Sequence, residues 1–61
     1  NPTSGLVNIQ APVGTIITLF DARGRVVETT TGSTIELPSP GPYVIMANYK
    51  GRIKRETIVR Q

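Results

Sequence analysis

The sequence predicts an all-β fold, a small antiparallel β-sandwich of about six or seven short strands in a single domain. The 61 residues suffice for one domain, and six glycines and five prolines in so short a chain predict frequent turns. The stretches between them are short and rich in threonine, valine and isoleucine, which favour strands. A domain of this size buries only about 60% of the surface that its unfolded chain exposes, so we expect a thin core.

Three strands are expected in the first half of the chain. The first spans residues 6–10, after which an Ala-Pro-Val-Gly sequence turns the chain. The second spans residues 15–20, where alternation places Ile17 and Leu19 on one face. The third spans residues 25–30 and follows a glycine-containing turn, so we expect it to pair with the second strand as a hairpin.

Three further strands are expected in the second half. A short strand spans residues 34–37, and residues 38–42 then hold three prolines, which lack an amide donor and should end the strand and cross to the other sheet. Residues 43–49 form the most apolar strand, expected at the centre of its sheet. A Lys-Gly turn leads into Arg52–Arg60, where imperfect alternation predicts a β-bulge near Glu56.

The side-chain inventory predicts that the chain is not an enzyme. It contains neither histidine nor cysteine, which removes the commonest general base and the strongest nucleophile. The four carboxylates fall on different expected elements with no paired spacing: Asp21, Glu28, Glu36 and Glu56. We therefore expect no catalytic residues, no metal site and no cofactor.

The basic residues are concentrated at the end of the chain. Residues 50–61 hold five of the seven lysines and arginines and one of the four carboxylates, so this segment carries +4 and the rest −1. Such a segment attracts an anionic partner, or it protects an exposed β-edge from pairing with other chains. A small barrel that binds single-stranded nucleic acid is a weaker alternative, because only three aromatic residues are present to stack on bases. We expect no nucleic-acid partner.

Two local features have a structural and a functional interpretation. Tyr43 follows a Pro-Gly-Pro corner, where a tyrosine often packs its ring inward and bonds its hydroxyl to nearby backbone; stacking on a ligand is the alternative. The turn at Gly24 lacks the further glycines and the helix of a phosphate loop. Arg23 and Arg25 beside it are interpreted as solvated turn residues, with docking as the alternative.

Four blocks of the sequence, in this order, resemble the C-terminal sorting domains of type IX secretion, the Por secretion system C-terminal domain family. The first block is an Asn-Pro followed by a polar stretch and a short strand, in residues 1–9. The second is an aliphatic hairpin, residues 17–27, with Asp21, Gly24 and Arg25 at its turn. The third is a Gly-x-Tyr block with Gly41 and Tyr43, and the fourth is a basic and then aliphatic terminus, residues 54–60.

The resemblance implies an immunoglobulin-like sandwich, residues 1–61, at the C-terminal end of a larger cargo protein. The cargo would pass through the periplasm, and the domain would direct it through the outer-membrane secretion machinery to the bacterial surface. There a sortase-like protease removes the domain in many family members, while others retain it. The expected partners are thus the machinery, the protease and the upstream cargo domains. The residues expected to be recognised are Lys54, Arg55, Ile58, Val59, Arg60 and Gln61.

The remaining expectations concern context and alternatives. A start at Asn1 rather than methionine suggests a fragment or a processed piece, and the longest apolar run, Val44 to Ala47, is too short to span a membrane. We further expect the machinery to meet the last strand by β-strand addition, with the basic side chains adding selectivity. The alternative is a fibronectin-like or transthyretin-like spacer or adhesion module of a surface protein. The thin core and exposed edges also allow isolated copies to dimerise or swap strands.

Overall fold

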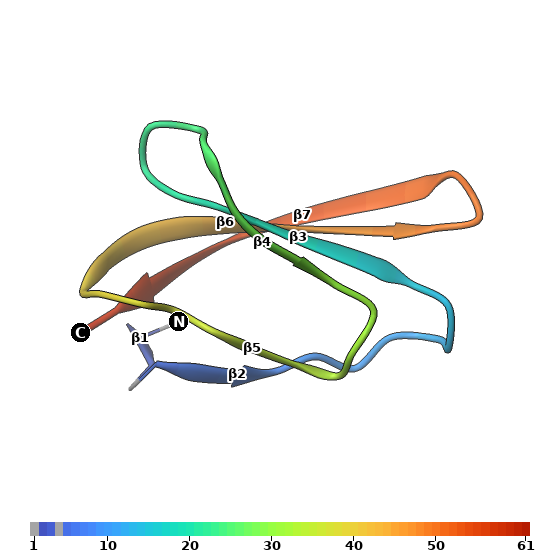
Figure 1. The fold of residues 1–61 in the computed structure, drawn as a ribbon, viewed down its shortest axis with the longest axis horizontal. Coiled ribbons are helices and arrows are strands. Elements are labelled where there is room, and N and C mark those ends of the chain that lie inside the picture. Colours follow the sequence, from blue (N-terminus) through green and yellow to red (C-terminus); the bar gives the residue numbers. More distant parts are fainter. Residues whose placement is uncertain (1, 4) are drawn as a thin grey trace.

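The computed structural model describes residues 2–3 and 5–61 and shows seven strands in this part of the chain (Figure 1). The strands are β1 (Pro2–Thr3), β2 (Leu6–Asn8), β3 (Ile16–Phe20), β4 (Val26–Thr30), β5 (Thr34–Glu36), β6 (Gly41–Tyr49) and β7 (Arg52–Arg60). The predicted all-β sandwich is confirmed, and the expected strands agree with the observed ones to within two residues at each end.

The strands form two sheets of unequal size (Figure 1). The large sheet has the order β1-β7-β6-β3-β4, and the small sheet contains only β2 and β5. β6 lies at the centre of the large sheet, and β3 and β4 form a hairpin, both as predicted. Apart from β1, all strand pairs are antiparallel.

The core lies between the two sheets, where the alternation of each strand points apolar side chains inward. The buried apolar side chains of the described residues are Ile17, Leu19, Ile35, Leu37, Tyr43 and Ile58. At the margin of this core lie four half-buried residues, Val7, Ile9, Ile45 and Ala47. The small sheet thus covers only part of the inner face of the large sheet.

The β-bulge lies in a different hairpin from the one predicted. The β6–β7 register runs without a shift from Gly41–Arg60 to Tyr49–Arg52, so the expected bulge near Glu56 is wrong. Ile58 reaches the core by regular alternation, because it lies opposite the buried Tyr43. The irregularity instead lies between Leu19 and Phe20, in the pairing of β3 with β4.

The proline-rich segment connects the two sheets, as expected, but it ends earlier than predicted. β6 already begins at Gly41, and Pro42 pairs in register with Val59. Proline is tolerated near the start of a strand, where loss of one amide donor interrupts the ladder least. Residues 38–42 therefore contribute both the crossing and the first two residues of β6.

The shortest strand was not predicted from the sequence. β1 runs parallel to the end of β7, with Pro2 opposite Val59 and Thr3 opposite Arg60. The chain then passes through Gly5, whose φ of 124° lies in a region that favours glycine, into the small sheet. The beginning and the end of the domain therefore lie side by side (Figure 1).

Candidate functional site

Five of the six residues expected to be recognised lie on the two faces of β7, and the sixth follows its end. These residues are Lys54, Arg55, Ile58, Val59, Arg60 and Gln61. The inner row of β7, which faces the small sheet, contains Lys54 opposite Ala47, and Ile58 opposite the buried Tyr43. Arg55 and Val59 face away from the core, as strand alternation requires. The structure therefore does not gather the six positions into one patch.

The C-terminal end of β7 contributes mainly to the fold. Ile58 is 8% exposed and belongs to the core, and Val59 pairs with β1. Arg60 packs against Gly5 so closely that a methyl group on the Gly5 Cα would lie 3.1 Å from Arg60 Nε. Among the basic positions expected to be recognised, Lys54 and Arg55 are exposed and Arg60 is half-buried.

One edge of the large sheet is open along most of β7. β7 contains nine residues, and β1 pairs with two of them, Val59 and Arg60. Within the described part of the chain, no strand pairs with Arg52 to Ile58 on that side. Such an edge presents unpaired backbone N–H and C=O groups, to which another strand can add.

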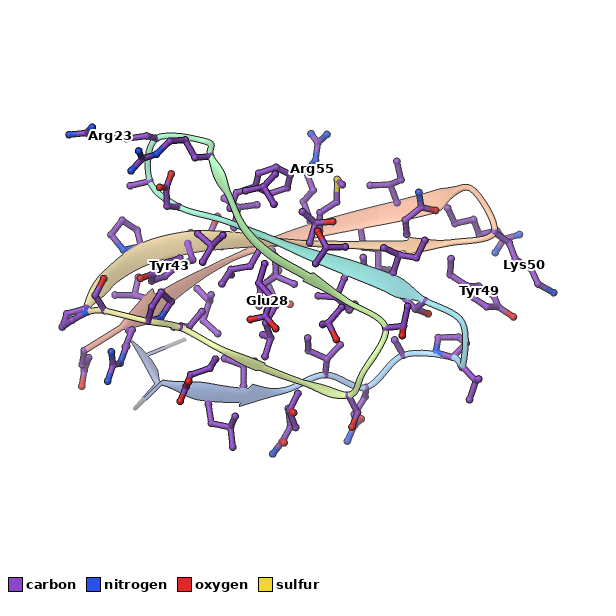
Figure 2. The ribbon with its side chains drawn as sticks, in the orientation of Figure 1. Arg23, Glu28, Tyr43, Tyr49, Lys50 and Arg55 are labelled. Atoms are coloured by element: carbon purple, nitrogen blue, oxygen red, sulfur yellow. The ribbon has the colours of Figure 1, made fainter. Side chains whose placement is uncertain are left out.

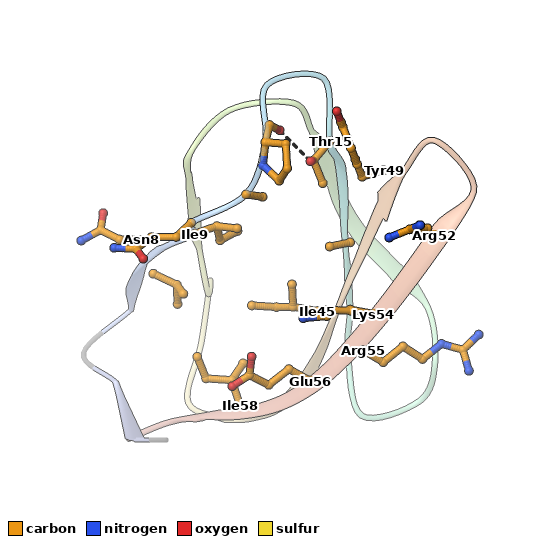
Figure 3. Close-up of a pocket in the computed structure, with 15 residues that line it drawn as sticks. Asn8, Ile9, Thr15, Ile45, Tyr49, Arg52, Lys54, Arg55, Glu56 and Ile58 are labelled. Carbon is orange, nitrogen blue, oxygen red and sulfur yellow. Dashed lines mark hydrogen bonds between the residues drawn. The ribbon is translucent and has the colours of Figure 1, made fainter.

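A groove of about 770 Å³ opens beside this edge (Figure 3). Its apolar lining includes Ile45 and Ala47 of β6, and its opposite wall is formed by residues 7–12 from the small sheet and the turn that follows it. Thr15 also lines the groove, but its hydroxyl is engaged, since it donates a hydrogen bond to the carbonyl of Pro12 at 2.6 Å. The groove exists because a sheet of two strands leaves one side of the large sheet uncovered.

The mouth of the groove carries a positive charge. Arg52, Lys54 and Glu56 line it from the inner row of β7, and Arg55 lies beside them on the outer row; all four are exposed, so this part of β7 carries three cations and one carboxylate. Among the described residues, none of the three cations lies within salt-bridge distance of a carboxylate. These side chains are therefore available to an anionic partner.

One aromatic side chain lies at the same end of the groove. Tyr49 lines the groove, and Lys50 Nζ lies 5.4 Å from the centre of its ring, a cation–π contact (Figures 2 and 3).

The turn between β3 and β4 gathers three of the residues quoted for the resemblance. Asp21 Oδ1 accepts hydrogen bonds from the backbone N–H groups of Arg23 and Arg25 at 2.9 and 3.0 Å. Asp21 Oδ2 accepts one from Arg25 Nε at 3.1 Å. The hydrogen bond from the Arg25 backbone is the main cause of a lowered Asp21 pKa, and burial opposes it. Gly24 has a φ of 81°, which the turn requires. This geometry is that of a self-contained turn.

Tyr43 shows the contacts expected from its structural interpretation. Its side chain is buried in the core, and its hydroxyl donates a hydrogen bond to the backbone carbonyl of Ser39. The ring is thus unavailable to a ligand. Gly41 begins β6 with a φ of 134°, a backbone conformation that other residues adopt rarely.

Among the described residues, the structure contains neither a cluster of metal ligands nor a membrane-spanning helix. In residues 2–3 and 5–61, no group of three or more acidic side chains is placed to hold a metal ion. The described residues form no helix that is long and apolar enough to cross a membrane.

Sequence reasoning missed the groove and two of its charged residues, Arg52 and Glu56. Both share the inner row of β7 with Lys54, although inner rows are normally apolar. Three charged residues at alternate positions, followed by an apolar one at Ile58, are the signal in the sequence. This pattern indicates a strand whose first part extends beyond the covering sheet.

Comparisons with models of protein families, with curated proteins and with solved structures find no match to this chain.

Proposed function

We propose that this domain is a C-terminal sorting signal that directs a cargo protein across the outer membrane by type IX secretion. The observation that supports the proposal most directly is the exposed, basic and mostly unpaired edge of β7 on a small sandwich. A sorting signal shared by many cargoes has to be read from its own surface, and this edge offers backbone groups and charge to a receptor. The resemblance of the four sequence blocks supplies the secretion route. Cleavage or retention of the domain at the cell surface belongs to the same proposal.

The structure favours substitution of exposed residues over deletion of the C-terminal residues as a test of the proposal. Deletion of residues 58–61 would remove Ile58 from the core and both partners of β1, so the domain would unfold. Loss of sorting after this deletion would therefore not distinguish recognition from folding. Lys54 and Arg55 are exposed, and their replacement leaves the core intact.

The experiment fuses residues 1–61 to the C-terminus of a periplasmically exported reporter in a bacterium that has the type IX machinery. We expect the reporter on the cell surface, and we expect the double variant Lys54→Glu/Arg55→Glu to accumulate in the periplasm. Arg23→Glu is the matched control, because it is an exposed arginine in the β3–β4 turn (Figure 2). A reporter that stays in the periplasm with the unaltered domain would refute the proposal.

One observation also favours the spacer alternative. β1 and β7 are parallel, so a chain that enters at β1 and leaves after β7 does so in opposite directions, as an in-line spacer between two domains requires. The same fusion separates the two functions, since a spacer does not reroute a reporter.

A further inference from the structure

We infer that the open edge of β7 binds an extended acidic peptide segment, which adds as a parallel strand along residues 52–58 and covers the mouth of the groove. The inference deepens the proposed function, on which it rests for the biological partner: the component of the machinery that meets β7 would present such a segment. Binding itself is a property of the purified chain and is tested separately.

The available length follows from the strand register. Of the nine residues of β7, β1 occupies two, and the other seven have no strand partner on that side within the described residues. Seven residues are a normal length for a strand, and addition at an open edge obtains its affinity from backbone hydrogen bonds. β4 forms the other edge of the large sheet, but it is five residues long and contains no lysine or arginine.

The direction follows from β1. This strand pairs with the same edge in parallel, with Pro2 opposite Val59. A segment that continues the same ladder runs parallel to β7, with its N-terminal end at Arg52 and its C-terminal end at Ile58, where the chain that precedes Pro2 has to turn away from the edge to leave room for it. The parallel geometry of the edge is thus already set by the chain itself.

The charge of the segment follows from the side chains along the edge. Arg52 and Lys54 lie on the inner row and Arg55 on the outer row, all exposed and without a carboxylate partner in the described chain. Acidic residues in the N-terminal half of the segment would lie beside these three cations. Toward the C-terminal end, the neighbours are Ile58 and the half-buried Ile45 and Val7, which favour an apolar side chain that fills the groove.

The two other candidate occupants fit less well. A second copy that pairs antiparallel along residues 52–58 would place Arg55 of one chain opposite Arg55 of the other, and like charges directly opposite each other in a strand pair are destabilising. Single-stranded nucleic acid needs aromatic rings on which bases stack, and among the described residues that line the groove Tyr49 is the one aromatic, which Lys50 already contacts.

The test uses the 61-residue chain and fluorescently labelled heptapeptides at low ionic strength, with binding followed by anisotropy. The probe carries glutamate at its first, third and fourth positions, serine at its fifth, valine at its seventh and threonine elsewhere. The matched control has the same composition in reversed order. We expect the probe to bind at least about tenfold more tightly than the reversed peptide, and added salt to weaken it.

The variants locate the site. Arg52→Glu/Lys54→Glu should weaken binding of the probe by at least about tenfold, since two attractive charge pairs are replaced by two repulsive ones. Arg23→Glu should leave the affinity unchanged. Amide chemical shifts in NMR spectra should change along residues 52–58 and not along β4.

Three results would overturn the inference. They are equal binding of the reversed peptide, tighter binding of a single-stranded oligonucleotide of the same charge, and a dimer in sedimentation that dissociates when residues 52 and 54 are changed. Failure of the reporter to reach the surface leaves the peptide result standing. Conversely, normal sorting of a chain that binds no acidic peptide refutes this inference alone.

Discussion

The hydroxyl of Tyr43 donates a hydrogen bond to the backbone carbonyl of Ser39 at 2.7 Å and accepts one from the backbone N–H of the same residue at 3.2 Å. The phenol ring belongs to the core, so this contact ties the crossing between the two sheets to the central strand. The proline-rich crossing is thereby held from inside the domain as well as by its own stiffness.

Tyr43→Phe should lower the free energy of unfolding by about 1–2 kcal/mol, because the ring remains buried while the Ser39 backbone loses its partner. Urea denaturation followed by circular dichroism measures the change. Tyr49→Phe is the matched control, since the Tyr49 hydroxyl has no hydrogen bond to the described residues, and it should cost about 0.5 kcal/mol or less. Equal effects of the two substitutions would contradict the role assigned to Tyr43.

Leu19→Ala should unfold most of the protein at room temperature. Leu19 is 0% exposed, and removing a buried leucine side chain costs about 2–5 kcal/mol, comparable with the whole stability that a single core supplies in so small a domain. Val13→Ala, at a position 99% exposed, should change stability by less than about 0.5 kcal/mol. Far-UV circular dichroism at 25 °C and thermal melting distinguish the two, and a cooperative melt of Leu19→Ala near that of the unaltered chain would be the contrary result.

Asp21→Asn should make folding less sensitive to acid. The pKa of Asp21 is lowered from its ordinary 3.8, chiefly by the backbone hydrogen bond from Arg25, so its folded pKa lies below its unfolded pKa. Its stabilising contribution is therefore complete above the unfolded pKa and is lost as the pH falls through the folded pKa. The melting temperature of the unaltered chain should exceed that of Asp21→Asn at about pH 6, and the gap should narrow toward about pH 2.5. A gap independent of pH would contradict the assignment.

Lys50→Asn should raise the stability slightly. Lys50 and Gly51 form a two-residue turn with φ values of 51° and 83°, a conformation for which Asn-Gly is the preferred sequence. The left-handed conformation costs lysine about 1 kcal/mol, and the lost contact with the Tyr49 ring is worth about 0.5 kcal/mol, so the net gain is about 0.5 kcal/mol. Differential scanning calorimetry should show a melting temperature higher by about 2–4 °C. Lys50→Ala, which loses the ring contact without relieving the backbone, should lower it.

The individual strands and turns could be predicted, because side-chain alternation and turn-forming residues each depend on a few residues that are adjacent in the sequence. Ile17 and Leu19 were expected on one face and are both buried, and the Lys50–Gly51 turn was expected between the last two strands. The parallel pairing of Pro2 with Val59 could not be predicted in this way. A strand of two residues is too short to show an alternation of apolar and polar side chains, and its partners lie at the other end of the chain.

The groove could not be predicted because it depends on how far one sheet covers the other. The imperfect alternation after Thr57, where Ile58 and Val59 are both apolar, predicts a bulge near Glu56. The regular register instead places Lys54 and Glu56 on the inner row together with Ile58. The small sheet contains only two strands, so this part of the inner row faces solvent. Coverage is a property of the packed sheets, and no single segment of the sequence encodes it.

The parallel contact of β1 with β7 also sets how the domain responds to mechanical tension. A force that draws the chain out at Pro2 and at Arg60 in opposite directions acts along the two strands, because parallel strands placed side by side are pulled past each other. The pairs Pro2–Val59 and Thr3–Arg60 are then loaded together in shear instead of opening one after another. Stretching at the two ends therefore has to separate both pairs together before the load reaches the core.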